Sequence, residues 1–118
     1  MIGQLHSVVI DAPDAHALAG FYAGLLGMEV KGEPGDDWVV VTGAGYRLAF
    51  QQAPDLRPPD WPDPERPQQF HLDVDVEDLD AGEQAVLELG ATKHDHQPGT
   101  TFRVFLDPAG HPFCLCVE

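Results

Sequence analysis

The same pattern occurs twice in this sequence. A short apolar run near the N-terminus carries His6, and an apolar-periodic stretch follows it and stops at Gly27. A second apolar run carries His71, and the stretch behind it stops at Gly90. The histidine and the glycine are 21 residues apart in the first half and 19 residues apart in the second. An internal duplication of this kind is typical of two paired modules, each with a strand, a helix and then further strands.

Charge and length restrict the possible partners and location. The chain has 118 residues, enough for one domain, and 20 acidic against 6 basic residues give it a net charge of −14. Such a surface repels nucleic acids and anionic membranes, so neither is an expected partner. No apolar run approaches the ~20 residues of a membrane span, and no signal-peptide pattern opens the chain. Cys114 and Cys116 are expected to be free thiols, and the predicted location is the cytoplasm.

The predicted fold is α+β, with module 1 at about 1–53, a linker at 54–67 and module 2 at about 68–118. Asp14 and Asp78 are the expected N-caps of the two helices, and the proline-rich linker can be neither helix nor central strand. β-branched and aromatic content predicts the strands, among them 38–42, 46–52, 101–106 and 113–117.

Alternation within the strands of module 2 separates two faces. Residues 70–76 place their apolar side chains toward the helices, which leaves His71, Asp73 and Asp75 on the opposite face. The closing strand likewise turns Phe113, Leu115 and Val117 to the core. Cys114 and Cys116 take its other face.

Three segments, 21–27, 71–74 and 107–115, resemble the vicinal oxygen chelate superfamily. This is the glyoxalase/bleomycin-resistance/extradiol-dioxygenase group, and the closing segment is most similar to its glyoxalase-like domain subgroup. The resemblance covers essentially the whole chain. It implies two paired βαβββ modules that form a curved, cup-shaped mixed sheet, commonly in a homodimer.

Metal-using members of this superfamily supply His or Gln, Glu, His and Glu as ligands. The resemblance carries these positions onto His6, Gln51, His71 and Cys114, so both glutamates are absent here. The protein is therefore expected to work without a tightly bound metal cofactor. The alternative is zinc, which His6, His71 and a Cys114 thiolate suit by their nitrogen and sulfur donors.

Further side chains are candidates for a substrate pocket. Arg47, Arg103, Trp61 and Cys114 are predicted to contribute to it. An arginine in the cavity can grip a carboxylate, whereas an arginine on the outer face pairs with surface acids, and both alternatives stay open. Trp61 packs either over the cup rim, at a subunit interface or against a ligand. His94 and His96 are interpreted as part of a solvated loop rather than a chelating cluster.

Three functions fit these residues. The first is a lyase or isomerase that acts on an oxygenated metabolite, with His6 or His71 as general base. The second is a protein that sequesters a drug or metabolite without chemistry, as bleomycin-resistance members do. The third is a structural or regulatory dimer with a vestigial cup. The missing glutamates favour the second and third over a metal-dependent glyoxalase, and the apolar cup favours a planar, partly aromatic small molecule.

Overall fold

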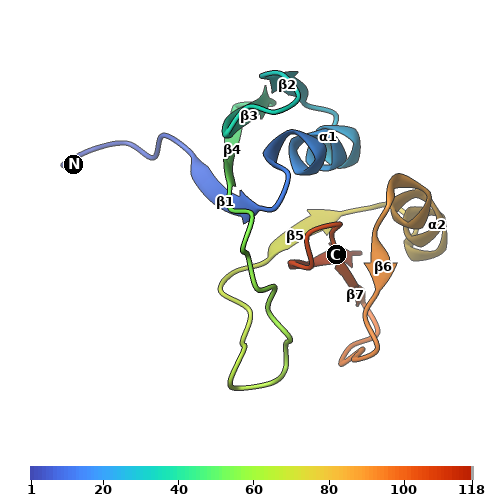
Figure 1. The fold of residues 1–118 in the computed structure, drawn as a ribbon. Helices are drawn as coiled ribbons and strands as arrows, with labels where there is room; N and C mark the ends of the chain where they lie inside the picture. The colour runs from blue at the N-terminus through green and yellow to red at the C-terminus, as the bar shows by residue number, and fades with distance from the viewer. Residues whose placement is uncertain (118) are drawn as a thin grey trace. The chain divides into compact units, whose positions relative to one another are not determined.

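The computed structural model describes residues 1–117 and divides into two compact units, Met1–Leu56 and a second that begins at Arg57. Over these residues each unit runs strand, helix, strand, strand, strand (Figure 1). The first unit consists of β1 (Val8–Ala12), α1 (Ala15–Leu26), β2 (Glu29–Lys31), β3 (Trp38–Gly43) and β4 (Tyr46–Gln52). The second consists of β5 (Leu72–Asp75), α2 (Leu79–Leu89), β6 (Thr92–Lys93), β7 (Phe102–Leu106) and β8 (Pro112–Cys116).

The two sheets have the same topology. Their strand orders are β1-β4-β3-β2 and β5-β8-β7-β6. In each sheet the first strand pairs in parallel with the last, and the remaining neighbours are antiparallel. The predicted α+β fold of two βαβββ modules is confirmed. The mixed sheet is present as one open four-stranded sheet in each module.

In the first module, α1 begins and ends where the sequence predicts. The side chain of Asp14 accepts a hydrogen bond from the backbone N–H of Ala17 at 3.1 Å. Gly27 ends the helix in the left-handed region at φ 66°, which a glycine adopts without steric cost. Tyr22 lies fully buried and stacks on Phe50 of β4, with 5.6 Å between ring centroids. This aromatic contact fixes the helix against the sheet.

In the second module, α2 packs over β8. Asp78 caps the helix by accepting from the backbone N–H groups of Asp80 and Ala81. Phe105 and Phe113 are both fully buried and stack at 5.7 Å on neighbouring strands. The core of this module is therefore built on one face of β7 and β8, which leaves their other face for a site.

The proline-rich segment predicted as a linker groups with the second unit from Arg57 onward. It closes on itself, because Asp60 N donates to the carbonyl of Arg66 at 2.6 Å and the Arg66 guanidinium donates to the carbonyl of Pro58 at 2.7 Å. That the two modules together make one domain stays a prediction.

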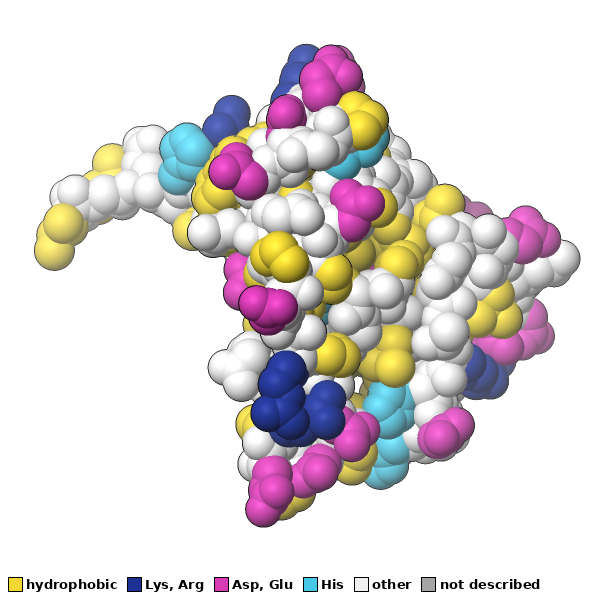
Figure 2. All heavy atoms as spheres, in the orientation of Figure 1, with side chains coloured by type: hydrophobic (Ala, Val, Ile, Leu, Met, Phe, Trp, Pro, Cys, Tyr) yellow, Lys and Arg dark blue, Asp and Glu magenta, His cyan; other side chains and the backbone are white. Residues whose placement is uncertain are grey.

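The surface is strongly acidic. Figure 2 shows acidic side chains over much of the visible face, with basic side chains gathered in a few places. None of the helices within residues 1–117 is long and apolar enough to cross a membrane.

The cap of α2 gives a direct test of this local structure. Substitution of Asp78 by Ala should lower the free energy of unfolding by about 1 kcal/mol, because two backbone N–H groups lose their acceptor. Urea denaturation followed by circular dichroism measures this. Glu77→Ala is the control, since it removes a neighbouring negative charge before the same helix. Equal losses in both variants would mean that charge, not capping, stabilises the helix start.

Candidate functional site

A pocket of about 290 Å³ opens on the face of β7 and β8 that α2 does not cover. Its walls are mainly apolar and come from Trp61, Pro98, Phe102, Val104 and Pro112. Alternation along β7 explains the placement: Phe102 and Val104 point into the pocket, whereas Arg103 between them points toward α2.

The polar end of the pocket lies where β5 meets β8. It contains Gln68, His71, Asp73, Cys114 and Cys116. Asp73 and Cys114 are direct partners in the parallel register, and His71 lies two residues before Asp73 on the same side of the chain. One donor atom from each of His71, Asp73 and Cys114 lies within 4.8 Å of the other two. The three side chains thus form a compact His/Asp/Cys cluster.

The members of the His/Asp/Cys cluster differ in burial and charge. His71 Nε2 lies 3.3 Å from Asp73 Oδ1, and both side chains are partly exposed, at 38% and 63%. Cys114 is buried. Burial raises the pKa of the Cys114 thiol to about 11, and the Asp73 carboxylate adds to the rise because it repels the thiolate. Cys114 is therefore a neutral thiol at physiological pH.

Cys116 lies two residues further along β8. Its pKa is also raised, chiefly by burial and then by the nearby carboxylates of Asp73 and Asp75. Both cysteines are free, as predicted. Their low thiolate content makes them poor nucleophiles at neutral pH.

The first module holds the other predicted site residues. The apolar run that carries His6 was expected to form the first strand of module 1, but β1 starts at Val8, so His6 precedes it. The parallel ladder pairs Val8 with Leu48, and His6 would stand opposite Tyr46, where β4 itself begins. His6 is exposed and its Nε2 lies 3.4 Å from Arg47 Nη1. The strand assignment of His6 was therefore wrong: the pairing of β1 with β4 stops at Val8, although β4 itself extends to Tyr46.

Gln51 is exposed on β4, on the face opposite Phe50. Its neighbour Gln52 points the other way and holds the start of α1, accepting from the N–H of Ala15 at 2.9 Å and donating to the carbonyl of Pro13 at 2.6 Å. A common cavity for His6 and Gln51 with the residues of module 2 stays a prediction.

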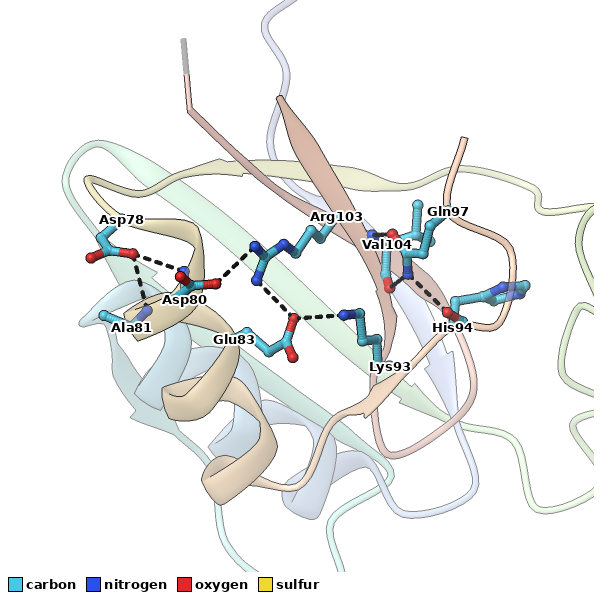
Figure 3. Close-up of polar contacts among 9 residues, drawn as sticks. All are labelled: Asp78, Asp80, Ala81, Glu83, Lys93, His94, Gln97, Arg103 and Val104. Atoms are coloured by element: carbon cyan, nitrogen blue, oxygen red, sulfur yellow. Dashed lines mark hydrogen bonds and ion pairs between the residues drawn. The ribbon is translucent and has the colours of Figure 1, made fainter. Parts of the chain in front are cut away.

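Arg103 does not line the pocket of module 2. Its guanidinium donates to Asp80 at 2.8 Å and to Glu83 at 3.0 Å, both on α2, as Figure 3 shows. Lys93 of β6 shares the carboxylate of Glu83 at 3.1 Å. These pairs hold the pKa of Glu83 below its usual value, chiefly through Lys93. The structure agrees with the alternative in which the arginine lies on the outer face and pairs with surface acids. Arg103 therefore joins α2 to the sheet and does not point into the pocket.

Trp61 forms the wall of the pocket next to the loop after β6. Its ring lies edge-on to His96 at 5.0 Å and to His94 at 5.6 Å. Gln97 ties this loop to β7 by donating to and accepting from the backbone of Val104 (Figure 3). The loop interpretation of the two histidines agrees with this geometry, since His94 Nδ1 accepts from the backbone N–H of His96.

Asp73 is the residue that sequence reasoning missed. Alternation placed its side chain on the same face as His71, but the family pattern assigns no ligand at this position. The sequence did indicate that Asp73 and His71 lie on the same face of the strand. It did not indicate which residue of β8 lies opposite Asp73. Gln68, Pro98 and Pro112 were also not predicted as pocket residues.

Several solved structures share the fold of this chain. A glyoxalase/bleomycin resistance protein/dioxygenase family enzyme from Burkholderia phytofirmans superposes with a TM-score of 0.70 at 19% identity, covering 96% of this chain and 97% of that chain. A glyoxalase family protein from Enterococcus faecalis gives 0.68 at 22% identity, covering 98% of both chains. A fosfomycin resistance protein from Listeria monocytogenes gives 0.71 at 15% identity, covering 100% and 95%.

The sequence itself matches one family over nearly its full length. The family described as the glyoxalase-like domain matches residues 7–116. The chain therefore belongs to the glyoxalase-like domain family, within the vicinal oxygen chelate superfamily, as its motifs predicted. No curated protein matches the sequence.

The thiol of Cys114 offers a test of the His/Asp/Cys cluster. Asp73→Asn should lower the pKa of Cys114 from about 11, because the repelling carboxylate is removed while burial keeps the value above that of an exposed thiol. The pH dependence of alkylation by iodoacetamide, measured in a Cys116→Ser background, reports this pKa. Asp75→Asn, two residues along the same strand, should leave it unchanged. If both asparagine variants behave alike, Asp73 is not beside the thiol.

Proposed function

We propose that this protein binds a small, planar and mainly apolar organic molecule in the pocket of module 2. The observation that carries the proposal is the pocket itself, with an aromatic and proline wall on one side and a few polar groups gathered at one end. Small-molecule sites usually have this composition, in which apolar walls supply affinity and the polar groups fix orientation.

The charge of the pocket selects among ligands. The residues that line it include one carboxylate, Asp73, and no lysine or arginine. Phosphorylated sugars and nucleotides would meet this carboxylate and the net charge of −14 without a basic partner. A neutral aromatic carbonyl compound fits better, because Trp61 and Phe102 offer ring contacts and His71 offers a hydrogen bond.

Calorimetric titration with matched naphthalene derivatives tests the proposal. Acetylnaphthalene should bind more tightly than naphthoate or naphthyl phosphate. His71→Ala should weaken its binding about fivefold, the effect of one hydrogen bond of about 1 kcal/mol. His16→Ala on α1 of the other module is the control and should leave binding unchanged. Preference for the phosphate, or equal affinities of the two alanine variants, would contradict the proposal.

A second function, a lyase or isomerase, is favoured by the pairing of His71 with Asp73. A carboxylate 3.3 Å from an imidazole nitrogen can orient the ring, which is how a general base is commonly supported. The lyase or isomerase would use His71 to remove a proton next to a carbonyl group. The alternative is a sequestering protein of the bleomycin-resistance kind, in which the same residues only hold the ligand.

Hydrogen exchange distinguishes these two functions without knowledge of the natural substrate. If His71 is a general base, the protein in D₂O should exchange the methyl protons of bound acetylnaphthalene for deuterium, and NMR should show the loss of that methyl signal. His71→Ala should abolish the exchange, and His16→Ala should not. Binding without exchange would identify a sequestering protein. The homodimer implied by the family resemblance is part of the proposal for either function.

A further inference from the structure

We propose that the loop of residues 94–99 sets the ligand preference of the pocket in module 2, and that Gln97 is the positioning residue that holds this loop in place. The inference rests on the proposed function and deepens it, because it names the residues that make the pocket select a flat ligand over a bulky one.

Gln97 fastens the 94–99 loop to β7 at the point where the β6–β7 ladder ends. The last ladder pair is Lys93 with Phe105. One more backbone bond follows, from the N–H of His94 to the carbonyl of Val104 at 3.1 Å. The Gln97 side chain then accepts from the N–H of Val104 at 2.9 Å and donates to the carbonyls of Val104 and His94, each at 2.8 Å (Figure 3). One amide side chain therefore joins loop and strand in place of a further backbone pair.

The strand residue to which Gln97 is bonded is itself part of the pocket. Val104 is buried, and its side chain lines the pocket from β7. Pro98, the residue after Gln97, lines the pocket from the loop. The hydrogen bonds of Gln97 thus set the distance between two lining residues that belong to separate segments.

The 94–99 loop also supports Trp61, which comes from a distant part of the chain. His94 Nδ1 accepts from the backbone N–H of His96 at 2.9 Å, and this bond orients the His94 ring. The indole of Trp61 lies edge-on to both imidazoles, with centroids 5.0 Å from His96 and 5.6 Å from His94. Aromatic rings at this separation favour edge-to-face geometry. The position of the indole on the pocket wall therefore follows the position of the loop.

At its other end the 94–99 loop lies against the ring of Phe102. A Cβ atom at Gly99 would overlap Cε1 of this ring and lie 2.6 Å from its Cζ. Real Cβ atoms do not approach other atoms so closely, so a side chain at position 99 would displace the ring or the loop. Glycine at this position is required by space, and it lets the Phe102 ring lie close to the loop backbone.

The loop thus fixes both aromatic walls, Trp61 and Phe102, before a ligand binds. Walls that are already ordered favour ligands that match their shape, because no side chain has to be immobilised on binding. A flat aromatic ligand keeps its ring contacts with both side chains. A saturated ring system has puckered faces and would have to push one of the two rings aside.

Titration of the full chain with two ketones tests this preference. Acetylnaphthalene has flat rings, and acetyldecalin is its saturated, puckered counterpart. The unchanged protein should prefer acetylnaphthalene. Gln97→Ala should weaken acetylnaphthalene binding about fivefold, since the ligand must then order Trp61 and the loop, and should change acetyldecalin binding by less than about twofold. Gln84→Ala on α2 is the matched control and should bind both ketones like the unchanged protein, because Gln84 is exposed and bonds only within its helix, to Glu88.

Gly99→Ala tests the other wall. The added methyl group overlaps the Phe102 ring, so the preference for acetylnaphthalene over acetyldecalin should fall in this variant too. Gly20→Ala on α1 is the control, because a Cβ atom at Gly20 meets nothing within 4 Å, and it should leave the preference unchanged.

The fluorescence of Trp61 separates positioning from a general loss of stability. The chain has two tryptophans, so Trp38→Phe leaves Trp61 as the only one. In this background and without ligand, Gln97→Ala should shift the Trp61 emission to longer wavelength and increase its quenching by acrylamide, because the indole loses its support. Gln84→Ala should change neither. If Gln97→Ala does not fold, Gln97→Glu replaces it, since a carboxylate keeps the acceptor for the N–H of Val104 and loses both donated bonds.

Unchanged Trp61 emission in a folded Gln97 variant, or an unchanged preference between the two ketones, would overturn the inference. A variant that lowers only the free energy of unfolding would do the same, because Gln97 would then have a purely structural role. If neither ketone binds the unchanged protein, the proposed function and the ligand preference fail together. The emission of Trp61 without ligand still decides in that case whether Gln97 positions the pocket wall.

Discussion

In each module the first strand pairs in parallel with the last, and the candidate site depends on this pairing in module 2. Asp73 and Cys114 are 41 residues apart in the sequence, yet the β5–β8 ladder makes them direct neighbours. Parallel strands require a crossover connection, which α2 and the strands after it provide. A shift of one residue in this register would turn Cys114 into the core and bring Phe113 or Leu115 to the pocket face.

The same alternation separates a structural face from a functional face. On β8, Phe113 and Leu115 are fully buried on the side of α2, while Cys114 and Cys116 line the pocket. On β7, Arg103 extends toward α2, where its charge is balanced by two carboxylates, and the residues on either side of it form the apolar wall. The ion pairs of Arg103 therefore lie outside the lining of the pocket.

Local features of the fold could be predicted from the sequence because they depend on neighbouring residues. The caps at Asp14 and Asp78 and the left-handed ends at Gly27 and Gly90 act within one helical turn, and the structure contains all four. The start of β1 could not be predicted in this way. β1 pairs with β4 only from Val8 onward, although β4 extends to Tyr46, and no local signal at His6 reports where this pairing stops.

The sequence by itself determined the duplication, the two βαβββ modules, the family and the face on which His71 and the two cysteines lie, since all of these follow from local periodicity and short motifs. Only the tertiary structure decided which of those side chains meet. Strand register brings Asp73 to Cys114, helix packing draws Arg103 away to α2, and the connector folds back to place Trp61 on the pocket wall. Such contacts join residues far apart in the chain, and their energies depend on distances that no local pattern encodes.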